Sequence, residues 1–135
     1  MGRLGEPWAM KRIITTPDAA EAVGAYSQGT TDGDLVFTAG QIALTPDGEF
    51  LDDEPVGVQT RQALENIRNI LEEAGLTMQD VLKVTVFLGD IDDYEAMNDA
   101  YAEYFQDNPP ARSAFGVGSL PKGAKVEIEA VAANK

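Results

Sequence analysis

The sequence contains neither cysteine nor histidine. Without cysteine the chain has no disulfide framework and no thiolate nucleophile, and without histidine it has no Ser-His-Asp triad. A zinc site built from cysteine or histidine ligands is excluded for the same reason. Any catalysis must therefore use carboxylates, arginine, lysine, tyrosine, amides, backbone groups or water.

Long hydrophobic runs are also missing, although hydrophobic residues make up 44% of the chain. No stretch approaches the roughly 20 apolar residues that a membrane-spanning helix needs, so we expect a soluble protein without a membrane partner. Residues 1–9 lack the apolar core of a secretory signal, which predicts a cytoplasmic protein. Met10 is a second possible start, so we interpret 1–9 as an N-terminal tail and 10–135 as a single domain.

Basic residues are scarce, with 10 lysines and arginines against 23 acidic residues and a net charge of −13. This charge repels phosphate backbones and anionic lipid surfaces, so we expect no nucleic-acid partner. The same balance is found in proteins that stay hydrated in concentrated salt and in ordinary acidic cytosolic proteins. The sequence leaves a halophilic origin open.

Hydrophobic periodicity predicts an alternation of strands and helices. Residues 56–74 carry apolar side chains at helical spacing and stop at Gly75, and a second helix is expected over about 94–105. Strands are predicted at 35–39, 81–88, 112–118 and 125–132, with a hairpin-like segment at 49–51 and further minor strands. The predicted order β-β-β-α-β-α-β-β favours an α+β two-layer domain, in which two helices cover one face of a mixed sheet.

The last predicted strand alternates between apolar and charged residues. Val126, Ile128 and Ala130 share one face, which should meet the helices. Lys125, Glu127 and Glu129 share the other face with Val131. This second face is either solvated or lines an interface with a neighbouring subunit and a ligand.

Arg112 and Glu129 are the two candidate catalytic residues. Arg112 follows a Pro-Pro turn at the start of a strand of small residues, where its planar fork suits a carboxylate ligand. A surface arginine or a salt bridge is the alternative. Glu129 lies between Ile128 and Ala130, where low-dielectric surroundings raise a carboxyl pKa and suit it to proton transfer. An outward-facing strand glutamate is the alternative.

Three further residues are candidates for substrate binding. Asn98 interrupts the apolar stripe of the second helix, so its amide needs partners on the packed side. Tyr26 brings a polar tip into a run of small residues, and Gly40 closes a strand where its N–H could face a ligand. Loop anchoring, core packing and a simple turn are the respective alternatives.

Several separated stretches resemble the Rid family of reactive intermediate deaminases, also called the YjgF-type family. They are GAYSQ at 24–28, LVFTAGQI at 35–42, QTRQALEN at 59–66, VTVFL at 84–88, Met97-Asn98, Tyr101, Tyr104-Phe105, PPARS at 109–113 and VEIEA at 126–130. The match runs from about residue 11 to 132. The resemblance implies a chorismate-mutase-like fold, assembled as a homotrimer whose sheets form a central barrel and whose ligand pockets lie between subunits.

The resemblance also implies the roles of the candidate residues. Arg112 would bind an imino acid carboxylate and Glu129 would position or deprotonate the attacking water, while Tyr26, Asn98 and the backbone around Gly40 would shape the pocket. Ala114 stands where many members have cysteine, and this position is thought to contribute mainly its backbone carbonyl to substrate binding. Ala25 and Ala39 replace a frequent proline and serine, so substrate preference could differ.

The activity that the resemblance implies is hydrolysis of 2-iminopropanoate and 2-iminobutanoate to 2-keto acids and ammonia. An imine carbon is already electrophilic, so the protein needs only to hold the carboxylate, orient water and manage protons. No cofactor or metal is expected. The alternative is a trimeric protein that binds small carboxylates or regulates without turnover. Ribonuclease activity, a third suggestion for the family, fits poorly with a charge of −13 and no histidine.

Overall fold

Six strands form one mixed sheet in the computed structural model of the chain, which describes residues 10–134. They are β1 (Arg12–Ile14), β2 (Gly29–Thr31), β3 (Leu35–Thr38), β4 (Val81–Leu88), β5 (Ala111–Gly116) and β6 (Val126–Ala133), in the spatial order β1-β2-β3-β6-β4-β5. Only β4 and β5 are parallel among the described strand pairs. The predicted tail at 1–9 lies outside the described residues.

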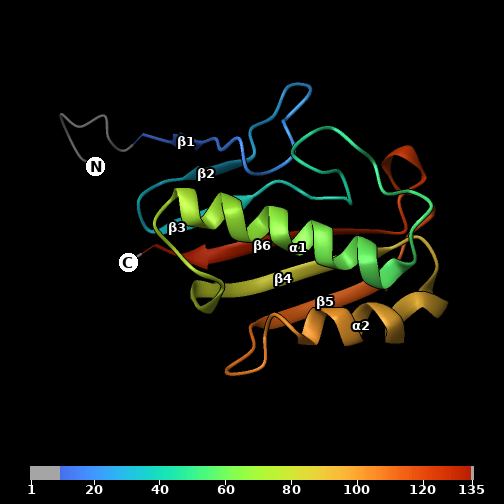
Figure 1. Ribbon diagram of the computed structural model, residues 1–135. Coiled ribbons are helices and arrows are strands. Elements are labelled where there is room, and N and C mark those ends of the chain that lie inside the picture. Colours follow the sequence, from blue (N-terminus) through green and yellow to red (C-terminus); the bar gives the residue numbers. More distant parts are fainter. Residues whose placement is uncertain (1–9, 135) are drawn as a thin grey trace.

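Two helices, α1 (Val56–Glu73) and α2 (Tyr94–Ala102), cover the same face of the sheet (Figure 1). Helix α1 packs on β3 and β6 and against α2. The predicted α+β two-layer architecture with a mixed sheet is therefore confirmed. Three short 3₁₀ turns at Met78–Asp80, Ile91–Asp93 and Pro121–Gly123 connect these elements.

Helix α1 forms because its apolar side chains recur every three or four residues. Leu64, Ile67 and Leu71 are at most 1% exposed and form the centre of the core. The helix ends at Glu73, where Gly75 takes a positive φ of 81° and its N–H bonds to the carbonyl of Glu72. Glycine adopts this conformation without the steric cost of a Cβ, as predicted from the sequence.

Alternation along the strands gives the sheet two different faces. Val84, Val86 and Ile128 point to the helices and are at most 1% exposed. The other face has no helix over it among the described residues, and it carries Phe37 and Phe115, which are 45% and 44% exposed. Apolar side chains on an uncovered sheet face are typical of a surface that contacts another chain.

The predicted element boundaries differ from the structure by one or two residues at several strand and helix ends, and by more at the end of α2. Helix α2 ends at Ala102 rather than near 105, because the N–H groups of Glu103 and Tyr104 form turn bonds to residues three positions earlier. The hairpin-like segment predicted at 49–51 is present as a short antiparallel bridge between Leu44 and Phe50. It is flanked by backbone hydrogen bonds from Thr45 to Glu49 and from Leu51 to Ala43, both at 2.9 Å. The loop around it is also held by side chains of α1.

Two buried amides of α1 fix the loop between β3 and the helix. Asn66 donates to the carbonyl of Leu44 at 2.8 Å. Gln59 donates to the carbonyls of Asp52 and Glu54 at 3.3 and 3.0 Å and accepts from the N–H of Lys125 at 3.1 Å. Because buried polar groups are costly unless they are paired, these contacts give the loop a defined position beside β6.

Candidate functional site

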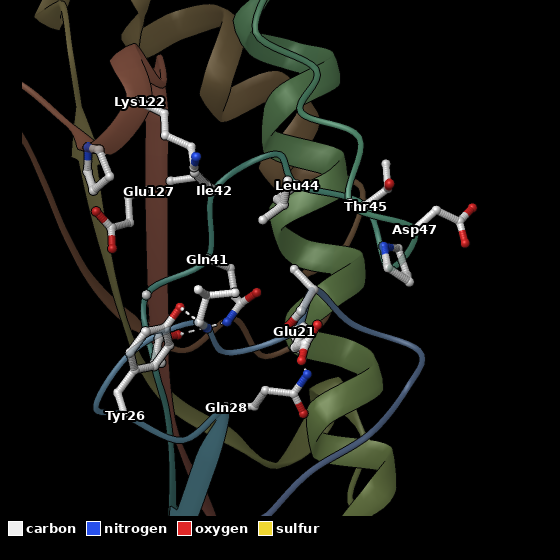
Figure 2. Close-up of a pocket in the computed structure, with 17 residues that line it drawn as sticks. Glu21, Tyr26, Gln28, Gln41, Ile42, Leu44, Thr45, Asp47, Lys122 and Glu127 are labelled. Carbon is white, nitrogen blue, oxygen red and sulfur yellow. Dashed lines mark hydrogen bonds between the residues drawn. The ribbon is translucent and has the colours of Figure 1, made fainter.

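A cavity of about 860 Å³ opens beside β6, and we call it the Glu127 pocket. Figure 2 shows Tyr26, Gln41 and Glu127 along its β6 side, with Leu44 on the side next to α1. Gly40 and Lys122 also line it, as do the loops around 20–23 and 44–48. The pocket therefore combines a carboxylate, amides and apolar walls, which is typical of a small-molecule site.

The loop that carries Tyr26 is held by one buried side chain. Gln28 is 3% exposed, and its amide accepts from the N–H of Thr16 at 2.7 Å and donates to the carbonyl of Ala20 at 2.8 Å. Tyr26 itself is 54% exposed, and its hydroxyl accepts from the N–H of Val23 at 3.3 Å. Most of the phenol ring is therefore available to a ligand or a second chain.

Gly40 and Glu127 are in immediate contact. A Cβ at residue 40 would overlap the carboxylate of Glu127, so only glycine leaves room for this side chain in its present position. The segment is fixed to β6 by hydrogen bonds between the backbones of Gln41 and Ile128, at 2.8 and 3.0 Å. Burial raises the pKa of Glu127 above its ordinary value of 4.5, and the charge of Glu129 raises it further.

Arg112 lies in a separate cluster with residues of α2. Its guanidinium donates to the Oδ1 of Asn98 at 2.8 Å and to the hydroxyl of Tyr94 at 2.6 Å. The guanidinium carbon is 4.6 Å from the centre of the Tyr101 ring and 5.5 Å from that of Tyr94. These contacts fix the direction of the side chain, and they use two of its five N–H groups.

This cluster borders a smaller cavity of about 340 Å³, which we call the Arg112 pocket. It is lined by Asn98, Tyr101, Ala102, Phe105, Pro109, Pro110 and Arg112. Arg112 and Asn98 supply its polar side chains, while Ala102, Phe105 and the two prolines supply apolar surface. A planar cation with free N–H groups in such surroundings is suited to a carboxylate.

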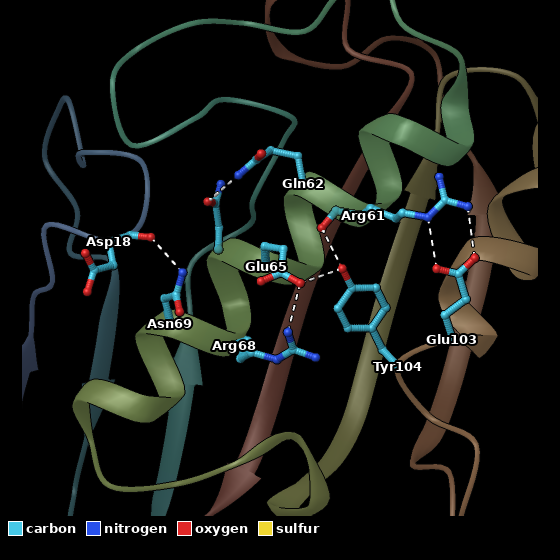
Figure 3. A network of polar contacts seen from close by, with 9 residues as sticks. Asp18, Arg61, Gln62, Glu65, Arg68, Asn69, Glu103 and Tyr104 are labelled. Carbon is cyan, nitrogen blue, oxygen red and sulfur yellow. Dashed lines mark hydrogen bonds and ion pairs between the residues drawn. The ribbon is translucent and has the colours of Figure 1, made fainter.

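Tyr101 and Tyr104 face opposite sides of the helix end. The hydroxyl of Tyr101 is buried, and it has no hydrogen-bond partner among residues 10–134. Burial raises its pKa to about 12, and the neighbouring guanidinium of Arg112 opposes this shift through its charge and its N–H groups. Tyr104 instead donates to Glu65 of α1 at 2.7 Å, within the polar network that joins the two helices in Figure 3.

Arg112 and the glutamates of β6 point to opposite faces of the sheet. Val84 of β4 pairs with both Arg112 and Ala130, and paired residues in neighbouring strands share a face. Val84 and Ala130 are buried under the helices, at 1% and 3% exposed. Glu127 and Glu129 occupy the alternate positions of β6 and therefore point to the uncovered face.

The structure separates the residues predicted for the site into two groups. Asn98 and Arg112 meet in the Arg112 pocket, while Tyr26 and Gly40 line the Glu127 pocket. Glu129 is exposed and lines neither of these two pockets. Ala114 lies two residues beyond Arg112 on the same strand face, half-buried against the core.

Sequence reasoning missed Glu127 and two tyrosines of α2. Glu127 and Glu129 have the same alternation and similar neighbours, so only the contact of Gly40 with β6 distinguishes them. Tyr94 and Tyr101 belong to the apolar stripe of the helix, which by itself predicts core packing. Their spacing from Asn98, four residues before and three after, was the signal that all three share one side of the helix.

Metal binding and membrane insertion find no support in the described part of the chain. Within 10–134, no group of three or more acidic, histidine or cysteine side chains is arranged to hold a metal ion. No helix in the same range is long and apolar enough to cross a membrane.

Comparison with known proteins gives extensive matches. The family model described as endoribonuclease L-PSP matches residues 16–134. A RutC family protein of Pyrococcus horikoshii is 48% identical over 124 residues, which cover 91% of this chain and 98% of that protein. The 2-iminobutanoate/2-iminopropanoate deaminase of Homo sapiens is 42% identical over 123 residues, covering 91% of this chain and 90% of that enzyme.

Solved structures share the same fold. The crystal structure of Escherichia coli TdcF with bound serine has a TM-score of 0.87 and 41% sequence identity. The similarity covers 92% of this chain and 99% of that one. Sequence and structure thus agree over nearly the whole of the described range.

Proposed function

Because the chain belongs to the Rid (YjgF-type) family, whose family model is described as endoribonuclease L-PSP, we propose that it hydrolyses 2-imino acids to 2-keto acids and ammonia. The observation that carries the proposal is the position of Arg112, a permanent cation that Asn98 and Tyr94 orient at the edge of a pocket. Its free N–H groups bind the carboxylate that every 2-imino acid carries.

The reaction needs only water in addition to the substrate. Water adds to the carbon of the C=N bond, and Glu127 accepts one proton of this water and passes it to the nitrogen, which gives a tetrahedral intermediate with a hydroxyl and an amino group. Glu127 then takes the remaining hydroxyl proton and delivers it to the nitrogen as the carbonyl forms and ammonia leaves. Its pKa, raised by burial and by Glu129, brings the carboxyl group closer to the neutral range in which proton transfer in both directions is efficient.

The proposed substrates are small. The human, rat and goat relatives are named 2-iminobutanoate/2-iminopropanoate deaminases, at 42 to 44% identity. The structure of TdcF carries serine, which is a small molecule with a carboxylate and a nitrogen on the neighbouring carbon. We therefore propose 2-iminopropanoate and 2-iminobutanoate as substrates, with pyruvate and 2-oxobutanoate as products. No cofactor takes part in this mechanism.

A complete site needs two copies of the chain under this proposal. Arg112 and Glu127 point to opposite faces of one sheet, so the Arg112 pocket of one copy has to meet the Glu127 pocket of another. The exposed Phe37 and Phe115 supply an apolar surface for such an assembly. A closed ring in which each chain contacts the next through two different surfaces gives one site per interface, and we propose a homotrimer.

Ribonuclease activity, which the description of the family model suggests, is not proposed. A chain with a net charge of −13 repels the RNA backbone, and it lacks histidine for acid-base cleavage. The competing possibility is a protein that binds small carboxylates without turnover. Arg112 alone would suffice for binding, whereas Glu127 in a second pocket is needed only if a proton is moved.

The test is an assay in which an amino acid oxidase releases 2-iminopropanoate or 2-iminobutanoate continuously in the presence of semicarbazide. Semicarbazide traps the imine, so a deaminase lowers the rate of semicarbazone formation. We expect the purified protein to lower this rate and Arg112→Ala to lose the effect. If the protein binds pyruvate yet leaves the rate of trapping unchanged, it is a binding protein and not a deaminase.

A further inference from the structure

The hydroxyl of Tyr101 is the one buried side-chain polar atom without a hydrogen-bond partner in the range 10–134. The whole residue is only 5% exposed. Leaving a buried hydroxyl unpaired costs free energy, and native structures contain few such groups. An exception of this kind requires an explanation.

The side chains that line the Arg112 pocket with Tyr101 offer no free acceptor. Arg112 lies over the Tyr101 ring and has only N–H donors, so it cannot accept the phenolic proton. The Oδ1 of Asn98 and the hydroxyl of Tyr94 already accept from Arg112. The other side chains around the pocket, from Ala102, Phe105, Pro109 and Pro110, have no acceptor atoms.

Tyr101 also lines the Arg112 pocket, where a ligand would bind. Its neighbour Arg112 supplies positive charge and free N–H groups. Burial keeps the pKa near 12, so the hydroxyl holds its proton at neutral pH and remains a donor. What is missing from this arrangement is an anionic acceptor.

We propose that Tyr101 is a substrate-binding residue, whose hydroxyl donates a hydrogen bond to the same carboxylate that Arg112 binds. This inference rests on the proposed function, because it assigns a second ligand to the carboxylate of the imino acid. The cation and the phenol then act together. Arg112 supplies the charge, while Tyr101 supplies a directed neutral donor that is unpaired until the ligand arrives.

An unpaired hydroxyl and a hydrogen-bonded one should affect the melting temperature in opposite directions when they are removed. Removing an unpaired buried hydroxyl relieves a cost in the free protein, whereas removing a paired one loses a bond. Tyr101→Phe should therefore keep or raise the melting temperature of the ligand-free protein. Tyr104 provides the matched control, since its hydroxyl is bonded to Glu65, and Tyr104→Phe should lower the melting temperature.

The experiment measures pyruvate binding by calorimetry, together with kcat and KM for imine hydrolysis. A hydrogen bond to a charged group contributes about 10- to 150-fold in affinity, so we expect Tyr101→Phe to weaken pyruvate binding about tenfold or more. KM should rise more than kcat falls, because the bond is made in the ground state as well. Tyr104→Phe should bind pyruvate like the parent.

A second ligand shows whether the carboxylate is the group involved. Methyl pyruvate has the same carbonyl without the negative charge, so the parent and Tyr101→Phe should bind it equally weakly. Tyr101→Phe that binds pyruvate within twofold of the parent would overturn the inference. So would a lowered melting temperature with unchanged binding, since the hydroxyl would then be paired within the assembled protein.

The two proposals can fail separately. If the parent hydrolyses the imine and Arg112→Ala does not, while Tyr101→Phe behaves like the parent, only the role of Tyr101 is wrong. If the parent neither hydrolyses the imine nor binds pyruvate, the proposed function is wrong, and the role of Tyr101 fails with it.

Discussion

Arg112 and Glu127 point to opposite faces of one β-sheet, although their strands are separated only by β4. Each side chain lines its own pocket, Arg112 beside α2 and Glu127 beside the loop that carries Gly40. The two groups needed for the proposed reaction therefore cannot converge on one small substrate within a single chain. This relationship gives the most direct test of the assembly.

Mixing two inactive variants should restore activity. If a site takes Arg112 from one copy and Glu127 from another, refolding equal amounts of Arg112→Ala and Glu127→Gln together leaves about one site in four intact, by random assembly of a closed ring. Imine hydrolysis should recover to about a quarter of the parent rate. Light scattering should give about three times the chain mass of 14.5 kDa. A mixture that stays inactive would indicate that each site belongs to one chain.

Removal of the Arg112 side chain should nearly abolish activity. Arg112→Ala loses a charge-assisted contact worth about 1.5–3 kcal/mol, which corresponds to roughly 10- to 150-fold in affinity for a keto acid. Arg112→Lys keeps the charge without the planar fork, so it should recover part of the affinity and less of the rate. Calorimetry with pyruvate and the trapping assay measure these effects. The carboxylate role fails if a folded Arg112→Ala works at the parent rate.

Glu127 and Glu129 should respond differently to replacement by glutamine. Glu127→Gln should slow hydrolysis by about 10²- to 10⁴-fold if the carboxylate transfers protons, with pyruvate binding largely kept. Glu129→Gln should retain activity and shift the acid limb of kcat/KM to lower pH, because the charge of Glu129 raises the pKa of Glu127. The reverse pattern would make Glu129 the residue that transfers protons.

The raised pKa of Glu127 also makes the stability of the protein depend on pH. A carboxyl group whose folded pKa is above its unfolded value destabilises the fold when ionised, and this cost disappears as the pH falls through the folded pKa toward 4.5, the ordinary value. Glu127→Gln should therefore melt at a higher temperature than the parent at pH 7. Thermal melts across this range should show the difference shrinking toward acid pH.

Gly40→Ala should separate activity from folding. The added methyl group occupies the position of the Glu127 carboxylate, which is the end of a flexible side chain and can turn away. We expect a folded protein with nearly the parent melting temperature and a kcat reduced toward that of Glu127→Gln. A variant with parent activity would show that this position of the carboxylate is not needed.

Salt should stabilise the protein. The net charge of −13 produces repulsion within each chain and between chains in an assembly, and ions screen this repulsion within about 10 Å at 0.1 M. The melting temperature should rise from low to molar salt, at about 3–4 °C for each kcal/mol gained in a domain near this size. A flat profile would leave the acidic composition without this explanation.

The sequence predicted more of the fold than of the candidate site. Helix α1 and strands β4 and β6 have strong periodic patterns, and each was found at nearly its observed limits. Strands β1 and β2 have three residues each, too few for a periodic signal, and they depend on pairing with β3. The end of α2 was missed because Tyr104 and Phe105 continue the apolar stripe beyond the last helical residue.

Some candidate site residues could be predicted from local sequence, whereas others depend on contacts between distant parts of the chain. Asn98 and Arg112 could be inferred as a binding pair from their residue types and the family resemblance, and the structure brings them to 2.8 Å. The choice between Glu127 and Glu129 depends on the register of residues 39–41 against β6, nearly 90 positions later in the chain. The sequence pattern of β6 contains no information about that register.

The order of the strands also determines when the sheet can form. Strand β6 lies between β3 and β4, and no described strand pair other than those with β6 joins the two parts of the sheet. During synthesis the first three strands and the β4-α2-β5 unit therefore leave the ribosome as two pieces with unpaired edges. A chain that stops before residue 126 would expose both edges, so early termination should yield aggregation-prone fragments rather than a smaller folded domain.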